Sequence, residues 1–157
     1  MLEMNQIGLD KDYAVKMNEK LNAYLSNVQI AYMNVRGYHW NIVGKQFYQL
    51  HAKFEDIYNS LNEMADEIAE RILMLGGTPV HAFSKYINMA TIKEKENVSS
   101  AEATVKEVLN ETLELLKNER EIVELAADNG DEGTVGLISG FIEEQEKLIW
   151  MLNATIK

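Results

Sequence analysis

One proline in 157 residues is the feature that most constrains the fold of this chain. Proline lacks a backbone N–H and interrupts helix interiors, so the residues on both sides of Pro79 are free to form long helices. No alternating apolar run lies between tight turns, so no β-strand is expected. The pattern therefore predicts an all-α protein.

Four stretches carry apolar residues spaced three or four positions apart, as amphipathic helices do. They span approximately Lys11–Gly37, Gln46–Leu75, Ser99–Asn129 and Thr134–Ala154. Ser99 followed by Glu102 fits a capping box and predicts the start of the third helix.

The connections between these helices predict how they are arranged. Short loops around Tyr38–Lys45 and Asn129–Gly133 make each flanking pair of helices antiparallel. The middle connection, Gly76–Val98, is long enough to cross the bundle and contains a short helix-compatible segment, Ala82–Ala90. A four-helix bundle with one long crossover is the ferritin-like topology. A single domain over residues 1–157 fits the length.

Composition excludes several classes of protein. The chain has no cysteine, which excludes disulfide scaffolds, cysteine-ligated metal sites and thiol nucleophiles. Its net charge of −10 suits cations and disfavours nucleic acid as a direct partner. The chain contains no run of 18 apolar residues, so no membrane-spanning helix is predicted. Met1–Asp10 lacks the pattern of a signal peptide, so a cytoplasmic location is expected.

Metal-binding residue types gather on the second predicted helix. His51 and Glu55 are four residues apart, as are Asp66 and Glu70, and such pairs share one helix face. At about 100° per residue, all four fall within an arc of about 100°, roughly 150° from the apolar stripe of the same helix. This polar stripe therefore faces away from the core of its own bundle. A solvated charged face is the ordinary explanation for exposed carboxylates.

Histidine nitrogen combined with carboxylate oxygen is a ligand set for iron, zinc or manganese. His51 and Asp66 lie about 22 Å apart along the helix axis, so one chain cannot bring both to one metal. No Glu-x-x-His motif of an intra-bundle di-iron site is present. If these residues bind metal together, two antiparallel copies of this helix would form two identical sites about a two-fold axis. His39, in the preceding predicted loop, could reach the same site.

The residues around these positions resemble the signature of the Dps family, the dodecameric mini-ferritins named as DNA-binding proteins from starved cells. The resemblance rests on Tyr38-His39-Trp40-Asn41-Ile42-Val43-Gly44, on Leu50-His51 with Phe54-Glu55, and on Asp66-Glu67-Ile68-Ala69-Glu70-Arg71. It implies a homo-dodecamer whose iron sites lie between two-fold-related subunits. By position, one subunit supplies His39, His51 and Glu55, its partner supplies Asp66 and Glu70, and each site holds at most two irons.

The same resemblance implies that the chain oxidises Fe(II), with hydrogen peroxide or oxygen, and stores Fe(III) mineral in a hollow shell. Trp40 stands where the family keeps an aromatic residue beside the centre, although simple packing explains it equally well. Asp131 and Glu132 fit the acidic pore by which iron enters, although helix N-termini favour acidic residues in any case. Gly136 stands where many relatives carry another Asp. His81 matches no ligand position.

Two other functions remain open at this stage. A nucleoid-compacting DNA-binding protein would suit the family name, but Met1–Asp10 contains no basic residue. Twelve copies at −10 each give a formal charge of about −120, so we expect no strong DNA binding. A generic helical scaffold would explain the polar stripe as a subunit interface, but not the joint occurrence of His39, His51, Asp66 and Glu70.

Overall fold

The computed structural model describes residues 1–157 as four long helices and one short helix. The helices are α1 (Lys11–Asn41), α2 (Phe47–Met74), α3 (Phe83–Met89), α4 (Ala101–Asp128) and α5 (Glu132–Thr155). The only β-type pairing is a single bridge between Met4 and Asp10. The predicted all-α bundle, with a short helix in its long crossover, is confirmed.

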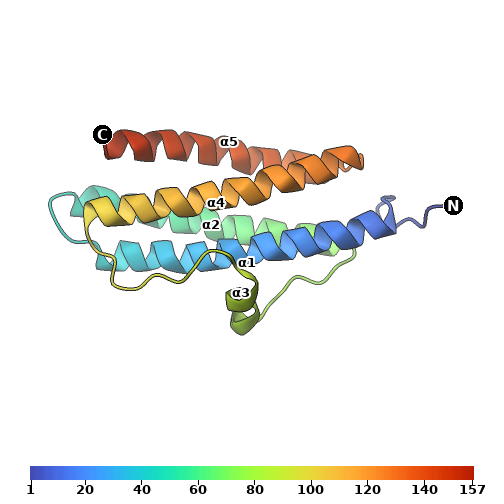
Figure 1. The fold of residues 1–157 in the computed structure, drawn as a ribbon, viewed down its shortest axis with the longest axis horizontal. Helices are drawn as coiled ribbons and strands as arrows, with labels where there is room; N and C mark the ends of the chain where they lie inside the picture. Colours follow the sequence, from blue (N-terminus) through green and yellow to red (C-terminus); the bar gives the residue numbers. More distant parts are fainter.

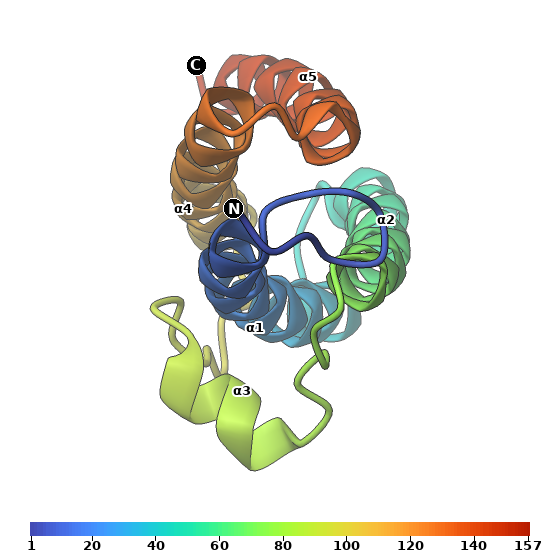
Figure 2. The same cartoon turned by 90° about the vertical axis from the view of Figure 1, so that its right-hand side faces the viewer.

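The long helices form two antiparallel hairpins, α1 with α2 and α4 with α5, joined through contact between α1 and α4 (Figure 1). The short helix α3 lies outside the bundle and packs on α1 (Figure 2). α2 and α5 approach each other less closely than the other neighbouring pairs, which Figure 2 shows as a wider separation. None of the helices combines the length and apolar character that crossing a membrane requires.

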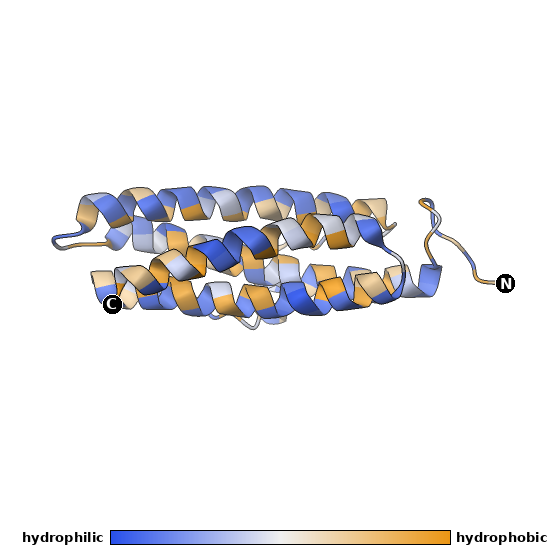
Figure 3. Cartoon of the chain, turned by 90° about the horizontal axis from the view of Figure 1, so that it is seen from above, coloured by the Kyte–Doolittle hydropathy of each residue, from blue (hydrophilic) through white to orange (hydrophobic).

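Hydrophobic and hydrophilic residues interleave along every long helix (Figure 3). The buried apolar side chains of these helices form one continuous core. Its largest fully buried side chains include Met17, Leu21, Tyr24, Leu25, Tyr38, Phe54, Ile68, Ile72, Leu116 and Ile122. The predicted apolar stripe of α2 is confirmed, because Phe54, Leu61 and Ile68 are all buried.

Three predicted boundaries are wrong, each for a local reason. α1 continues to Asn41, so His39 lies in its last turn and not in a loop. α4 begins after Ser100, whose hydroxyl accepts the N–H of Ala103, so Ser99 and Glu102 form no capping box. α5 begins at Glu132, two residues before the predicted start, because Asp131 caps it. A side-chain cap is decided by which hydroxyl or carboxylate reaches a free N–H.

Buried asparagines on α1 hold the long crossover in place. Asn27 Oδ1 accepts the backbone N–H groups of Thr91 and Ile92, at 2.8 and 3.0 Å. Asn34 Oδ1 accepts the N–H of Lys95, and its Nδ2 donates to the carbonyl of Lys93. Since irregular backbone has no partners of its own, these side chains satisfy polar groups that burial would otherwise leave unpaired. The crossover is therefore anchored along the outer side of α1.

Two glutamates of α4 lie inside the bundle. Glu111 is 5% exposed, and its Oε1 accepts hydrogen bonds from Asn34 Nδ2 and the Tyr38 hydroxyl. Glu119 is 0% exposed, and its Oε2 accepts from the Tyr24 hydroxyl and Gln145 Nε2. Burial outweighs these hydrogen bonds and raises the pKa of Glu111 to about 8 and that of Glu119 to about 7. Both groups therefore hold protons near neutral pH that an unfolded chain would release.

This difference predicts that the folded state loses stability as pH rises. Between about pH 5 and pH 8 the folded chain binds more protons than the unfolded chain, so the free energy of unfolding falls with pH. Each unit of pKa difference is worth about 1.4 kcal/mol, so we expect a loss of several kcal/mol across this range. Urea denaturation at stepped pH measures it. A double variant, Glu111→Gln with Glu119→Gln, should flatten the dependence, and a midpoint that rises with pH in the wild type would contradict the assignment.

Candidate metal centre

His39 and His51, the two histidines of the predicted site, are in contact where α1 ends and α2 begins. His39, 7% exposed, lies in the last turn of α1, and the half-buried His51 lies in the second turn of α2. Their rings stack with centroids 3.8 Å apart and planes 12° apart. The short loop between the helices brings these residues, twelve positions apart, into contact.

Each histidine binds the backbone of the other. His39 Nδ1 donates to the carbonyl oxygen of His51 at 2.6 Å, and His51 Nδ1 donates to the carbonyl oxygen of His39 at 2.7 Å. A carbonyl only accepts, so Nδ1 carries a proton in both rings, and the neutral form of each ring keeps its lone pair on Nε2. The His39 carbonyl belongs to the last helical turn, where no intrahelical N–H reaches it. The reciprocal bonds therefore fix both rings with Nε2 available as a ligand atom, as in metal-binding histidines.

Aromatic side chains support the histidine pair. The Phe47 ring stacks on His51 with centroids 4.9 Å apart, and the Tyr58 ring meets His39 edge-on at 5.3 Å. These contacts restrict rotation of both imidazoles, which lowers the entropy lost when a ligand is bound. Tyr58 was not among the residues predicted for the site. It follows His51 by seven residues, or two helical turns, and this spacing places the two residues on the same face of α2.

The carboxylates of the predicted site all face solvent. Glu55 lies one turn after His51 on α2, and Asp66 and Glu70 lie towards the other end of the same helix. The prediction that this stripe points away from the core is confirmed by their exposure. No three His, Asp or Glu side chains of one chain come together as a metal-binding group. Within one chain the structure thus brings His39 and His51 together, but not the two ends of the stripe.

Trp40 lies next to the histidine pair in sequence but on the outside of α1. It is 58% exposed, and the guanidinium carbon of Arg36 lies 5.0 Å from its ring centroid. The same guanidinium lies 5.6 Å from the Tyr58 ring and 5.8 Å from the Tyr32 ring. Trp40 is therefore held by a cation–π contact and is not part of the core.

The two acidic residues predicted to line a pore have different surroundings. Glu132 is exposed at the start of α5, whereas Asp131 is only 1% exposed. Asp131 accepts from the Tyr13 hydroxyl at 2.6 Å, pairs with Arg71 at 2.7 Å and caps α5 through Thr134. Asp131 therefore does not have the exposure that a pore-lining residue needs. His81 is exposed and its Nδ1 lies 3.0 Å from the carbonyl of Pro79, away from the other histidines.

The Asp131 network ties the ends of α1, α2 and α5 together, and its loss should destabilise the protein. Burial alone would raise the pKa of Asp131, but hydrogen bonds from Thr134 and Tyr13 and the charge of Arg71 hold it below its usual value. Asp131→Ala leaves the largely buried Arg71 guanidinium unpaired, which typically costs about 3 kcal/mol. Urea denaturation tests this, with Asp128→Ala, at an exposed carboxylate of the preceding turn, as the matched control. Equal midpoints for the two variants would contradict the network's role.

Comparison with known proteins extends the structural observations. The family model described as a ferritin-like domain matches residues 18–157. A "DNA protection during starvation protein" of Porphyromonas gingivalis is 42% identical over 147 residues, covering 94% of this chain and 92% of the relative. The crystal structure of Dps from Vibrio cholerae O1, described as a ferritin-like diiron-carboxylate protein, superimposes with a TM-score of 0.97 at 48% identity, covering 100% and 99%. Dps from Bacillus brevis gives a TM-score of 0.90 at 29% identity, covering 93% and 98%.

Proposed function

Because this chain belongs to the Dps family of ferritin-like proteins, we propose that it is a mini-ferritin that oxidises Fe(II) with hydrogen peroxide and stores the Fe(III) mineral inside a twelve-subunit shell. One observation carries the proposal. The stacked pair of His39 and His51 is fixed through both Nδ1 atoms and keeps both Nε2 atoms available, next to the exposed carboxylate stripe of α2. If the carboxylates of α2 formed only a solvent-exposed charged surface, two histidines fixed in this way beside them would have no explanation.

The site is completed by a second subunit. Antiparallel packing of two α2 helices about a two-fold axis places the His51 end of each beside the Asp66 and Glu70 end of the other. One subunit then supplies His39, His51 and Glu55, and its partner supplies Asp66 and Glu70. The lack of a three-ligand group within one chain agrees with a shared site.

The ligand set suits iron as the substrate. Imidazole nitrogen and carboxylate oxygen both bind Fe(II). Carboxylates stabilise Fe(III) more than Fe(II), because the ion of larger charge gains more from anionic ligands. Two Fe(II) ions each lose one electron, one hydrogen peroxide accepts both, and its O–O bond breaks to give two hydroxide ions. Pairing the two electrons at one site avoids release of hydroxyl radical.

The exposed positions beside the centre and at the start of α5 have proposed roles as well. Glu132 is the acidic residue of the predicted pore that remains accessible to incoming Fe(II). Trp40, exposed on α1 and next to His39 in sequence, remains the aromatic residue assigned to the surroundings of the centre.

Oxidation of Fe(II) by stoichiometric hydrogen peroxide in a purified sample tests the proposal. We expect ferric absorbance to reach its maximum at half an equivalent of peroxide per Fe(II). The particle mass should be near twelve times 17.9 kDa. The net charge of −10 per chain also predicts no gel shift of DNA at moderate salt. A stable monomer at micromolar concentration, or a rate of Fe(II) oxidation no greater than in a protein-free blank, would refute the assignment.

A further inference from the structure

Arg36 lies among three aromatic rings at the edge of the candidate metal centre. Its guanidinium carbon is 5.0 Å from the ring centroid of Trp40, 5.6 Å from that of Tyr58 and 5.8 Å from that of Tyr32. All three cation–π contacts of the chain belong to this one side chain. The Tyr58 ring in turn meets the ring of His39, a proposed iron ligand, at 5.3 Å. A fixed positive charge therefore lies beside oxidisable rings that reach the centre itself.

No carboxylate of the chain neutralises this charge. The other two arginines, Arg71 and Arg120, each form a salt bridge, whereas none of the chain's salt bridges includes Arg36. Arg36 Nη1 donates to the uncharged Tyr32 hydroxyl at 3.1 Å, and its buried Nε donates to no group. The electric field of the guanidinium at the surrounding rings is therefore not cancelled by an anion of the same chain.

A cation beside an aromatic ring changes how readily that ring loses an electron. Attraction between the guanidinium and the negative face of the ring stabilises the neutral ring. Loss of one electron leaves a ring radical cation, which the same guanidinium repels. At the 5.0 Å that separates Arg36 from Trp40, repulsion between two unit charges disfavours the oxidised ring about fourfold at the dielectric constant of water, and more at lower values. Arg36 therefore makes Trp40 a poorer electron donor.

The ease of ring oxidation matters because of the proposed reaction with peroxide. Two Fe(II) ions and one hydrogen peroxide give two Fe(III) and two hydroxide ions. If only one Fe(II) is bound, the second electron has to come from another donor. One Fe(II), one aromatic ring and one hydrogen peroxide then give Fe(III), a ring radical cation and two hydroxide ions. A ring that resists electron loss disfavours this second route and so avoids damage to the protein.

We propose that Arg36 protects the aromatic side chains beside the metal centre, Trp40 above all, from one-electron oxidation during peroxide turnover. This role rests on the proposed function, because turnover of iron and peroxide supplies the oxidising conditions. The chain contains its own reference in Trp150, the only other tryptophan. Trp150 is 66% exposed, against 58% for Trp40, and no cation lies over its ring.

Oxidation of the iron-free assembled protein by nitrogen dioxide radicals, generated by pulse radiolysis, measures the effect of Arg36 without using the iron site. This oxidant takes up one electron to become nitrite, and because it is neutral, Arg36 does not attract or repel it. Peptide mass spectrometry gives the modified fraction of Trp40 relative to that of Trp150. We expect Arg36→Met to raise this ratio about fourfold or more, and Arg36→Lys, which retains the charge, to keep it near the wild-type value.

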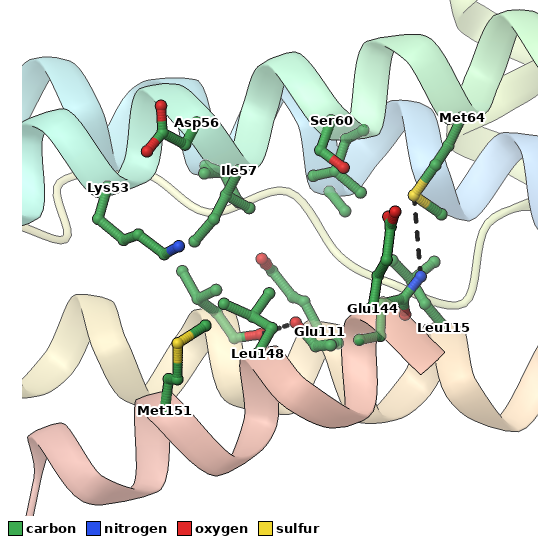
Figure 4. Close-up of a pocket in the computed structure, with 16 residues that line it drawn as sticks. Lys53, Asp56, Ile57, Ser60, Met64, Glu111, Leu115, Glu144, Leu148 and Met151 are labelled. Atoms are coloured by element: carbon green, nitrogen blue, oxygen red, sulfur yellow. Dashed lines mark hydrogen bonds between the residues drawn. The ribbon is translucent and has the colours of Figure 1, made fainter. Parts of the chain in front are cut away.

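Lys53→Met is the matched control, because it removes a cation that takes part in no cation–π contact. Lys53 of α2 lines a cavity between α2, α4 and α5, whose wall also includes Glu111, and Figure 4 shows its amino group directed into this space. The control variant should leave the ratio of modified Trp40 to modified Trp150 at its wild-type value.

Two results with the iron-free protein would overturn the proposal. An unchanged ratio in Arg36→Met would show that the charge does not affect Trp40. An equal rise in Arg36→Lys would show that only the packing of the arginine side chain matters.

A second measurement applies the same readout to turnover. With one Fe(II) per site and one equivalent of hydrogen peroxide, modification of Trp40 should be about fourfold or more greater in Arg36→Met than in the wild type. Equal modification, in samples that oxidise Fe(II), would overturn the protective role. Failure to oxidise Fe(II) would instead refute the proposed function, and the iron-free ratios would still report the effect of Arg36 on Trp40.

Discussion

Replacing His39 and His51 together by alanine is expected to slow peroxide-driven oxidation of Fe(II) at least about a hundredfold. Loss of groups that only orient a metal ligand typically costs tenfold to a hundredfold, and here two ligands themselves are removed. No other histidine lies near enough to replace them, because His81 is exposed in the crossover. Stopped-flow absorbance after mixing Fe(II)-loaded protein with hydrogen peroxide measures the rate.

The matched control is His81→Ala, which removes a histidine from the same chain and should leave the rate unchanged. Light scattering is needed beside the kinetics, because His39 and His51 also link α1 to α2 through their Nδ1 bonds. A double variant that assembles normally and oxidises Fe(II) at the wild-type rate would show that the histidine pair is structural only.

Shells assembled from a mixture of His51→Ala and Asp66→Asn chains should recover activity that neither variant has alone. In a mixed dimer one site carries both lesions and the other carries neither. With random pairing half of the dimers are mixed, so activity should return to about a quarter of the wild type. Iron oxidation rates before and after disassembly and mixing give the measurement.

This experiment distinguishes a shared site from a site within one chain. If each chain formed its own centre, every site in the mixture would keep one lesion and no activity would return. A mixture of His51→Ala with Glu55→Gln chains is the matched control, because both lesions lie on the same side of the shared site and cannot complement each other. Absence of recovery in shells shown to be mixed would refute the roles proposed for Asp66 and Glu70.

The sequence predicted the elements and their order because the signals for them are local. Apolar spacing, one proline and two short connections are properties of neighbouring residues, and they were sufficient for four long helices, the short helix and the outward polar stripe of α2. Boundaries were less predictable, since a cap depends on which side chain reaches a free N–H. Ser100 took that role in place of Ser99, and Asp131 took it three residues before the predicted start of α5 at Thr134.

Only the tertiary structure decided how the site residues are held and which carboxylates are buried. The reciprocal bonds of His39 and His51 depend on the angle at which α1 meets α2, and sequence spacing carries no such information. Asp131 became a buried partner of Arg71, and Glu111 became a cavity wall, because helices distant in the chain close over them. Periodicity gives the direction of a side chain from its own helix axis, whereas burial depends on what a second helix places in that direction.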